Sequence, residues 1–307
     1  MTLTELKYVV AVARERHFGR AAEACFVSQP TLSVAIKKLE EELDVKLFER
    51  GTTEVAVTPL GEQIVRQAQQ VLEQAAAIKE IAKLGKDPVT GPLRLGIIYT
   101  IGPYLLPDLV RQAIERVPQM PLMLQENFTT RLLEMLRTGE LDCAILAEPF
   151  PDTGLAVAPL YDEPFMAAVP AQHPLARRKS VSAEELKNET MLLLGTGHCF
   201  RDHVLEVCPE YAHFSSDAEG IRKSFEGSSL ETIKYMVASG MGVTVVPQLS
   251  VPKEPQPHVR YVKFVPPPPT RRVVLAWRRT FPRYEAIAAL RNCIYACPLE
   301  GVKRLSR

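Results

Sequence analysis

Residues 28–50 read SQPTLSVAIKKLEEELDVKLFER, and this stretch decides the fold of the N-terminal region. Ser28 suits the N-cap of a helix, and Pro30 is tolerated in a first helical turn. Apolar residues then recur at spacings of 4, 3 and 4 and share one buried helix face: Leu32, Ile36, Leu39 and Leu43. The stretch therefore predicts an amphipathic helix with a core face and a polar outer face.

The outer face of this helix suits a DNA groove, because Pro30, Ser33, Val34 and Lys37 lie opposite the apolar face. Short hydroxyls let a backbone approach DNA closely, and lysines reach phosphates. The basic charge is also local: residues 1–38 carry six Lys and Arg against three Glu, a net of +3, in a chain of net charge +1. A solvated amphipathic helix without a partner has the same pattern, so the helix alone leaves both interpretations open.

Short elements flank this helix. Thr2 and Glu5 form a predicted capping box at the start of a first helix, and residues 19–24 suit a short second helix. After Phe48, the sequence ERGTTEVAVT alternates and carries a glycine, which predicts a small hairpin, or wing.

A long helix is predicted to open at Thr58-Pro59. Its apolar residues are spaced 4, 4, 3, 4, 3 and 4 apart, which is typical of a coiled-coil seam: Leu60, Ile64, Ala68, Val71, Ala75, Ile78 and Ala82. Such a seam needs a partner, so we expect dimerisation. A helix packed on its own domain is the alternative.

Residues 84–90 are the best candidate linker, and strands alternate with helices beyond them, which predicts a parallel α/β sheet. Expected strands are 93–98, 120–126, 141–146, 165–169, 191–194, 243–246 and 273–277, and expected helices are 107–117, 131–137 and 228–239, the last with a capping box of Ser228 and Glu231. Two proline-rich patches, 252–257 and 266–269, suit crossings between subdomains.

Composition indicates a soluble globular protein, with 46% hydrophobic and 24% charged residues. We find no signal peptide or transmembrane helix near the N-terminus, so the cytoplasm is the expected location and no membrane partner is expected. Six cysteines in a reducing compartment are more often buried, metal-bound, catalytic or redox-active than a disulfide scaffold. Cys293 and Cys297 share a helix face, but no further ligand cluster suggests a metal.

The second informative stretch is GTGHCFRDHVLEVC, residues 195–208. Cationic neighbours of Cys199 would favour the thiolate that attacks a peroxide: His198, Arg201 and His203. If the nine steps to Cys208 are helical, the two Cα atoms lie about 13.5 Å apart at ~1.5 Å per residue. A disulfide needs roughly 4.4–6.8 Å. Oxidation would then require local refolding, although two buried, incidental cysteines remain an open alternative.

The Ser-Gln-Pro start and Leu-Phe-Glu-Arg close of residues 28–50, with Phe18, Arg20, Ala21 and Ala22 before them, resemble the winged helix-turn-helix of LysR-type transcriptional regulators. The resemblance implies an α/β protein with an N-terminal winged helix-turn-helix, a long dimerisation helix and a two-subdomain effector domain like a periplasmic binding protein. The implied bounds are 1–58 for the DNA-binding domain, 59–90 for the dimerisation helix and hinge, and 91–307 for the effector domain. Within the last, subdomain I takes 91–162 and 268–307, and subdomain II takes 163–267.

The same resemblance implies which residues meet promoter DNA. Those facing double-stranded DNA are Gln29, Pro30, Thr31, Ser33 and Lys37, with Arg50 contributing from the wing. Wings of this family often carry several basic residues, but residues 51–57 contain no Lys or Arg and include Glu54. The recognition helix is therefore the stronger part of the expectation.

The His-Cys-x-Arg-Asp run at 198–202, together with Cys208, resembles the OxyR group, the hydrogen-peroxide sensors among LysR-type regulators. This implies an activator of oxidative-stress genes in which Cys199 reacts with peroxide and Cys208 closes a reversible disulfide. Thr100, Thr129 and His198 would form the peroxide pocket, and Arg271 or Arg272 would lie near it. The resemblance further implies a homotetramer (a dimer of dimers), RNA polymerase as partner, a thiol reductant such as glutaredoxin, and no cofactor or metal.

Two other functions fit parts of the sequence. A metabolite-responsive LysR-type regulator would bind a small molecule in its effector cleft and keep full function without Cys199 and Cys208. A thiol peroxidase would turn over rapidly with a reductant, but that hypothesis leaves the DNA-binding helix unexplained. We therefore expect a regulator and not an enzyme.

Overall fold

The computed structural model describes residues 1–50, 55–84, 89–151, 154–209 and 225–305. The chain forms two compact units that divide between Lys86 and Asp87. In the described parts of both units, no helix combines the length and apolar character needed to cross a membrane.

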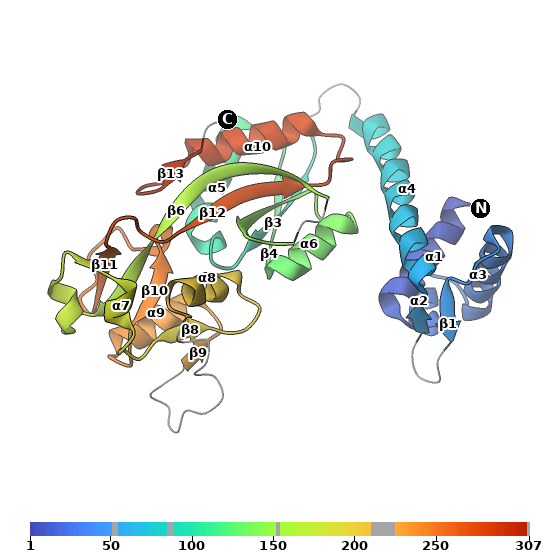
Figure 1. Ribbon diagram of the computed structural model, residues 1–307. Helices are drawn as coiled ribbons and strands as arrows, with labels where there is room; N and C mark the ends of the chain where they lie inside the picture. Colours follow the sequence, from blue (N-terminus) through green and yellow to red (C-terminus); the bar gives the residue numbers. More distant parts are fainter. Residues whose placement is uncertain (51–54, 85–88, 152–153, 210–224, 306–307) are drawn as a thin grey trace. The chain divides into compact units, whose positions relative to one another are not determined.

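The first unit is a small helical domain with a two-stranded wing (Figure 1). Its elements are α1 (Leu3–Glu15), α2 (Phe18–Ala24), α3 (Gln29–Leu43), β1 (Phe48–Arg50), β2 (Val55–Val57) and α4 (Pro59–Leu84). The predicted caps are confirmed: Thr2 and Glu5 form a capping box on α1, and the Ser28 side chain accepts from the Thr31 backbone on α3. Helix α2 begins at Phe18, with the His17 ring capping it.

Helix α3 is fixed on both sides. Leu32, Ile36 and Leu39 are buried in the core of this unit, as their spacing predicts. At its far end, one Glu40 carboxylate oxygen accepts from the backbone N–H groups of Leu47 at 2.8 Å and Phe48 at 3.3 Å. The wing strands pair antiparallel, with Phe48 opposite Val57. The start of the wing is thus tied to the helix that precedes it.

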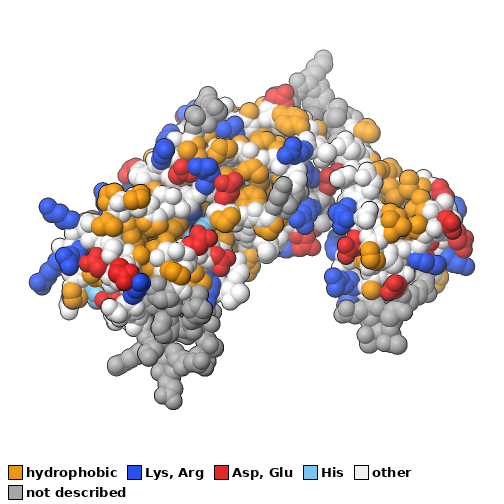
Figure 2. Space-filling model, in the orientation of Figure 1, with side chains coloured by type: hydrophobic (Ala, Val, Ile, Leu, Met, Phe, Trp, Pro, Cys, Tyr) orange, Lys and Arg blue, Asp and Glu red, His pale blue; other side chains and the backbone are white. Residues whose placement is uncertain are grey.

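Helix α4 packs on its own unit and also leaves apolar side chains exposed. Ile64 and Ala68 lie against the core of the first unit. Leu60, Val71 and Ile78 remain 46%, 37% and 69% exposed. Figure 2 shows hydrophobic side chains gathered over this helix. The alternative, packing on its own unit, is therefore confirmed for Ile64 and Ala68, while dimerisation through the exposed residues of the seam stays a prediction.

The second unit is built on a nine-stranded mixed sheet with helices against it (Figure 1). Its first half contains β3 (Leu93–Ile98), α5 (Gly102–Arg116), β4 (Leu122–Asn127), α6 (Thr129–Arg137), β5 (Cys143–Glu148) and β6 (Ala156–Pro170). Further along lie a 3-10 turn (Pro174–Arg177), β7 (Ser180–Val181), α7 (Ala183–Leu186), β8 (Leu192–Leu194), α8 (Cys199–Val207), β9 (Phe225–Gly227), α9 (Leu230–Ala238) and β10 (Thr244–Pro247). A second 3-10 turn (Gln248–Ser250), β11 (Val259–Phe264), β12 (Thr270–Trp277), α10 (Tyr284–Ala296) and β13 (Lys303–Arg304) complete it.

Strand β6 organises the sheet because it changes partners along its length. Residues 156–164 pair with β12, and residues 165–170 pair with β10 and β11. The sheet order is β4-β3-β5-β12-β6-β11-β7, with β10 and β13 also paired to β6. Strands β3, β4 and β5 pair in parallel, while β12 runs antiparallel to β5 and β6. The expected all-parallel sheet is therefore only partly correct.

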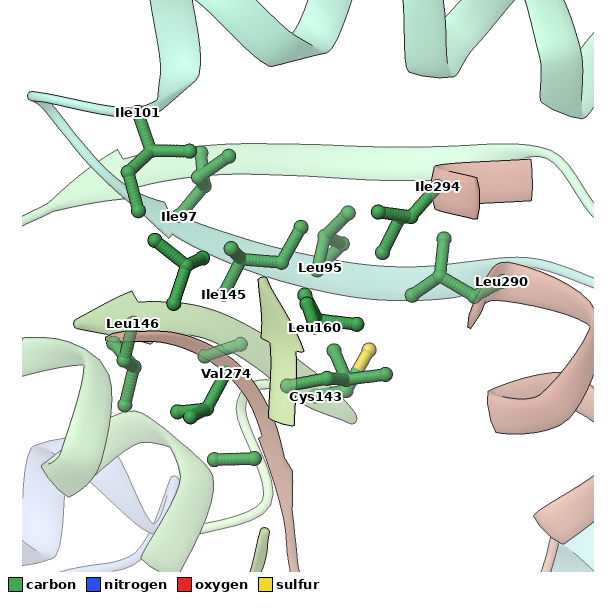
Figure 3. Close-up of a cluster of buried hydrophobic side chains, with 14 of the residues drawn as sticks. Leu95, Ile97, Ile101, Cys143, Ile145, Leu146, Leu160, Val274, Leu290 and Ile294 are labelled. Carbon is green, nitrogen blue, oxygen red and sulfur yellow. The ribbon is translucent and has the colours of Figure 1, made fainter. Parts of the chain in front are cut away.

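Two hydrophobic cores lie along this sheet, one for each half of β6. Figure 3 shows the first core, where side chains from β3, β5 and β12 meet those of α10: Leu95, Ile97, Ile145, Val274, Leu290 and Ile294. The second core gathers the far half of β6, β8, β10 and α9, and it includes Phe200 and Cys208 of α8. The two ends of α8 are thereby positioned by packing.

Two predicted helix starts are wrong. Helix α5 begins at Gly102 and contains Pro107, because Pro103 already occupies its first turn. Helix α9 is capped by Ser229, whose side chain accepts from the Thr232 backbone, so the expected capping box of Ser228 and Glu231 does not form. Glu231 instead accepts a hydrogen bond of 2.6 Å from Tyr104 and pairs with Lys234.

Candidate functional site: a buried thiol pocket and a DNA-facing helix

The residues expected to face DNA lie together on α3 and its N-terminus. Gln29, Pro30, Thr31 and Lys37 are exposed, and Ser33 is half-buried. The Thr31 hydroxyl lies 2.8 Å from the Ser28 hydroxyl, and Lys37 pairs with Glu41 at 3.5 Å on the surface. Arg50 ends β1, but its side chain and residues 51–54 of the wing lie outside the described residues. One face of α3 thus exposes short polar side chains and one basic side chain, that of Lys37, to the surface.

Cys199 and Cys208 mark the two ends of α8. Cys199 is the first residue of this helix, and Cys208 is its C-cap, with its backbone N–H donating to Val204. Neither cysteine is in a disulfide; Cys199 is half-buried and Cys208 is 0% exposed. Nine helical steps of ~1.5 Å separate their Cα atoms by about 13.5 Å, well beyond the reach of a disulfide. The condition set out from the sequence, a helical segment between the two cysteines, is therefore met by α8.

A small pocket opens beside Cys199. Its lining includes every residue predicted for a peroxide site: Thr100, Thr129, His198 and Cys199 itself. Tyr99, Phe128 and Gly197 complete much of the wall. The cavity volume is about 10 Å³, close to the space that one water molecule needs. The pocket suits a very small polar molecule.

The Thr129 hydroxyl is available to such a molecule. Thr129 begins α6 and is 8% exposed, and its Oγ1 makes no hydrogen bond of ordinary geometry with the described residues. It nevertheless lies close enough to the Cys199 thiol to lower the pKa of that thiol. A buried hydroxyl without a partner is costly unless a ligand or water satisfies it.

Thr100 is held by a buried ion pair. Arg271 donates to the Thr100 hydroxyl at 2.8 Å and to the Thr100 carbonyl at 3.0 Å. The same guanidinium pairs with Glu163 at 2.8 Å, and both side chains are almost fully buried. Beneath it, the Phe200 ring lies 5.2 Å from the guanidinium carbon. Arg271, rather than Arg272, is therefore the arginine next to the pocket; Arg272 pairs with Asp162 on the surface.

The His198 ring lines the pocket in its neutral form. Its ring packs edge-on against Phe128 and Tyr99, with centroids 4.9 Å and 5.8 Å apart. Burial lowers the pKa of His198, although a backbone hydrogen bond at Ser228 acts in the opposite direction. A neutral imidazole has one donor and one acceptor, so it can orient a hydrogen-bonding ligand.

The acidity of Cys199 reflects competing effects. Burial raises the pKa of the thiol, and Asp202 raises it further, whereas Thr129 and Arg271 lower it. The expected cationic neighbours contribute little: His198 is neutral, and Arg201 donates to the Leu194 carbonyl at 2.9 Å. The first turn of a helix also favours an anion. The cation that matters comes from β12, about seventy residues away in sequence, and not from the adjacent residues.

Gly197 allows the chain to turn into this pocket. Its φ of +100° is a conformation that side-chain-bearing residues rarely adopt, and an added Cβ would lie 3.4 Å from the Phe128 ring. Phe128 and Tyr99 are pocket residues that sequence analysis did not identify. Both follow the C-terminal end of a parallel strand, β4 and β3, the edge where ligands usually bind in such sheets.

The other cysteines form no comparable site. Cys143 lies in β5 within the first core, and burial raises its pKa. Cys293 and Cys297 are buried one helical turn apart, and the Cys297 thiol contacts the Cys293 carbonyl. Across the described residues, no three His, Cys, Asp or Glu side chains are grouped to hold a metal ion.

Family models match both units. Residues 3–62 match the bacterial regulatory helix-turn-helix protein model of the lysR family. Residues 86–296 match the LysR substrate binding domain. Together the two matches account for most of the chain.

Individual relatives are similar over nearly the whole length. A hydrogen peroxide-inducible genes activator of Pectobacterium carotovorum subsp. carotovorum is 41% identical over 292 residues, covering 94% of this chain and 95% of the relative. A full-length OxyR variant from Pseudomonas aeruginosa is 48% identical, with a TM-score of 0.77, covering 100% of this chain and 98% of that one. A hydrogen-peroxide-bound OxyR mutant from Corynebacterium glutamicum is 34% identical, with a TM-score of 0.62, covering 95% and 91%.

Proposed function

The chain belongs to the LysR family of bacterial regulators, and from this membership we propose that it senses hydrogen peroxide through Cys199 and Cys208 and regulates transcription. The relatives named as peroxide-inducible gene activators and OxyR support this class of function. One observation carries the proposal: the Cys199 thiol shares a pocket about 10 Å³ in volume with Thr100, Thr129 and His198.

The proposed chemistry has two steps. The Cys199 thiolate attacks one peroxide oxygen, an S–O bond forms, the O–O bond breaks, and the second oxygen leaves as water after taking a proton. The Cys208 thiolate then attacks the sulfenic sulfur, an S–S bond forms, and the S–O oxygen leaves as water. Two thiols and one peroxide thus become a disulfide and two water molecules.

Pocket groups support the first step. The Thr129 hydroxyl makes no hydrogen bond of ordinary geometry with the described residues, Thr100 is oriented by Arg271, and neutral His198 offers a donor or an acceptor to the peroxide. The positive charge of Arg271 stabilises the thiolate that burial opposes. A thiolate in such surroundings can react while solvent is largely kept out.

The second step requires α8 to refold. About 13.5 Å separates the Cα atoms at ~1.5 Å per helical residue, and a disulfide needs roughly 4.4–6.8 Å. The refolded segment would change the surface of the effector domain and, through it, the pairing of DNA-binding domains. Reduction by a thiol partner such as glutaredoxin would restore the helix.

We assign DNA contacts to Gln29, Pro30, Thr31, Ser33 and Lys37, with Arg50 from the wing. The exposed polar face of α3 supports this assignment. Short polar side chains read the edges of nucleobases, and basic side chains contact the phosphates. The target is double-stranded promoter DNA, and RNA polymerase is the expected downstream partner. The family is a class of transcriptional regulators, so the thiol chemistry is a signal and not a turnover.

We also propose the domain bounds 1–58, 59–90 and 91–307 and a homotetramer built as a dimer of dimers. Exposed apolar residues of α4 support pairing through that helix. Exposed apolar residues of the second unit support separate pairing of effector domains: Ile114 on α5 and Met123 and Leu124 on β4. The expected location is the cytoplasm.

Peptide mapping under non-reducing conditions tests the proposal. One equivalent of hydrogen peroxide should link Cys199 to Cys208 rapidly in the wild type. Cys208→Ser should instead hold Cys199 as sulfenic acid, trapped by dimedone, and Cys199→Ser should remain unoxidised. Promoter DNA binding, measured on the same samples, should change only where the disulfide forms. Reduced cysteines in a wild type whose DNA binding responds to a metabolite would overturn the proposal in favour of a ligand-responsive regulator.

A further inference from the structure

The helix between the two reactive thiols is anchored by three side chains. Phe200 packs against Phe165, with ring centroids 5.1 Å apart, and Arg201 donates to the Leu194 carbonyl. The third anchor is His203, whose Nε2 lies 2.8 Å from the Glu148 carbonyl oxygen at the end of β5. His203 therefore hydrogen-bonds α8 directly to the backbone of a strand of the first core.

The bond partner fixes the protonation of His203. A carbonyl oxygen only accepts, so Nε2 must carry the proton. In a neutral imidazole, Nδ1 is then bare, and it is buried with no hydrogen-bond partner in the described parts of the chain. His203 is 4% exposed, and burial lowers its pKa, so the neutral form is favoured.

Charged groups from two elements and a backbone carbonyl from a third face His203. Asp202 and Glu206 lie on α8 itself, Arg271 comes from β12, and Glu148 contributes its backbone carbonyl from β5. The carboxylates raise the pKa of His203 and Arg271 lowers it, but burial is the largest effect. A second proton would therefore place an unpartnered N–H and a charge inside the protein.

Helix α8 is packed mainly on one side. A cavity of about 440 Å³ borders its other side, lined by His203, Glu206 and Val207 and, across from them, by Phe264, Val265 and Pro267. A helix of nine residues has little stability of its own and depends on tertiary contacts. Among the described residues, this cavity leaves part of α8 without close packing, so the contacts on its packed side matter more for keeping it folded.

We propose that His203 is a positioning residue that holds α8 in its helical, reduced form through the Glu148 carbonyl and so sets how readily the disulfide closes. The inference rests on the proposed function, because it concerns the second of the two steps. The hydrogen bond must break when residues 199–208 refold. Removing it leaves peroxide attack on Cys199 unchanged and makes disulfide closure more favourable.

The first test compares two variants of the full chain. His203→Phe keeps a ring against Phe165 and Phe200 but removes the donor, whereas His203→Gln retains an amide donor. His203→Phe should shift the thiol–disulfide equilibrium toward the disulfide about fivefold and speed closure by up to the same factor, as expected for one lost hydrogen bond. His203→Gln should stay close to the wild type. Sulfenic acid formation, measured in the Cys208→Ser background, should not change.

A second test uses pH. Because burial lowers the pKa of folded His203 from its ordinary 6.5, the stabilisation of α8 is fully present above that value and is lost as pH falls toward the folded pKa. The ratio of the His203→Phe and wild-type disulfide equilibrium constants should therefore fall from about five near pH 8 toward one near pH 5.5. The ratio cancels the ionisation of the thiols themselves. For His203→Gln against His203→Phe, the ratio should be independent of pH.

The outcomes separate the two claims. If the wild type forms no Cys199–Cys208 disulfide, the proposed function fails. If it does, but His203→Phe closes the bond with wild-type rate and equilibrium, or the pH-dependent ratio is flat, the role of His203 is refuted. Should His203→Phe not fold, the pH dependence of the wild type against His203→Gln remains decisive, because only the wild type should lose α8 stability in mild acid.

Discussion

Thr129 and Thr130 are adjacent threonines in different surroundings, which allows a matched test of the pocket. Thr129 is buried with an unused hydroxyl, and Thr130 is exposed. Thr129→Val keeps the side-chain shape and removes only the hydroxyl. We expect oxidation of Cys199 by peroxide to slow about tenfold or more, since one hydrogen bond to the reacting oxygens is lost.

Stopped-flow oxidation in the Cys208→Ser background measures this rate. The free energy of unfolding should stay the same or rise slightly for Thr129→Val, because an unsatisfied buried polar group disappears. Thr130→Val serves as the control and should react like the parent. A parental rate for Thr129→Val would exclude the hydroxyl from the reaction.

Arg271 and Arg272 form a second neighbouring pair with opposite burial. Arg271→Met leaves the Glu163 carboxylate, which is 0% exposed, without its cation, and we expect the free energy of unfolding to fall by about 3–5 kcal/mol. Arg272→Met breaks a surface pair with Asp162 and should cost about 0–1 kcal/mol. Urea denaturation of the reduced protein measures both. Equal losses would mean that the buried pair is not the structural centre of the pocket.

At the residue scale, the sequence predicts which residues line the pocket, but not the direction in which the pKa of Cys199 is shifted. Cys199, Thr100, Thr129 and His198 were selected by family resemblance and lie around one cavity. The choice between Arg271 and Arg272 was open, and alternation along β12 does not decide it, because Val273 and Val274 are both buried. The raised pKa of Cys199 could not be predicted, because burial and Arg271 act through tertiary packing.

At the scale of elements, α8 gives a direct prediction for the oxidised state. The amide protons of Val204–Cys208 are protected by helical hydrogen bonds in the reduced form, and disulfide closure must break several of them. We expect hydrogen exchange in this segment to accelerate at least tenfold after oxidation. Mass-spectrometric exchange measures the change, with α10 (Tyr284–Ala296) as an internal reference that stays constant.

Cys208→Ser provides the control for this experiment, because peroxide oxidises its Cys199 without linking the helix ends. Its α8 should remain protected. Unchanged protection in a wild type whose disulfide is proven by mass would show that the bond closes without unfolding the helix, contrary to the geometry of nine helical steps.

Element types were more predictable than element starts. The capping residues in the sequence were enough to predict where α1 and α3 begin, since Thr2 and Ser28 cap these helices. They failed for α5 and α9, where competing candidates lie within a few residues: Pro103 against Pro107, and Ser229 against Ser228. The start of α5 has no side-chain cap and carries Pro103 in its first turn, whereas α9 is capped by Ser229; the spacing of apolar residues does not distinguish these starts from the neighbouring candidates.

At the scale of the whole molecule, α4 exposes three large apolar side chains: Leu60, Val71 and Ile78. Ile78, 69% exposed, would bury a charge in the dimer if replaced by Glu. Ile78→Glu should weaken self-association at least tenfold, measured by sedimentation velocity over a concentration series of the full chain. Gln70→Glu, at an exposed polar position of the same helix, should associate like the wild type. Identical behaviour of both variants would exclude α4 as the interface.

The pairing of distant β-strands in the second unit could not be predicted from the sequence. Alternating strands and helices predicted an α/β sheet, but β12 returns antiparallel between β5 and β6. Its partners lie more than a hundred residues away, and hydrophobic alternation does not distinguish parallel from antiparallel neighbours. The change of partners within β6 near Pro164 and Phe165 likewise depends on contacts that only the folded chain defines.

That continuous strand has a mechanical consequence. Fifteen residues at ~3.3 Å each make β6 about 50 Å long, and both cores of the second unit are built on it. Because one strand runs through both cores, a hinge motion between the two cores would have to bend this strand and disturb its pairing with neighbouring strands. Local unfolding and refolding of a short segment disturbs fewer of these contacts than closure of one core against the other. The structural change on oxidation is therefore expected to stay within the nine-residue helix α8.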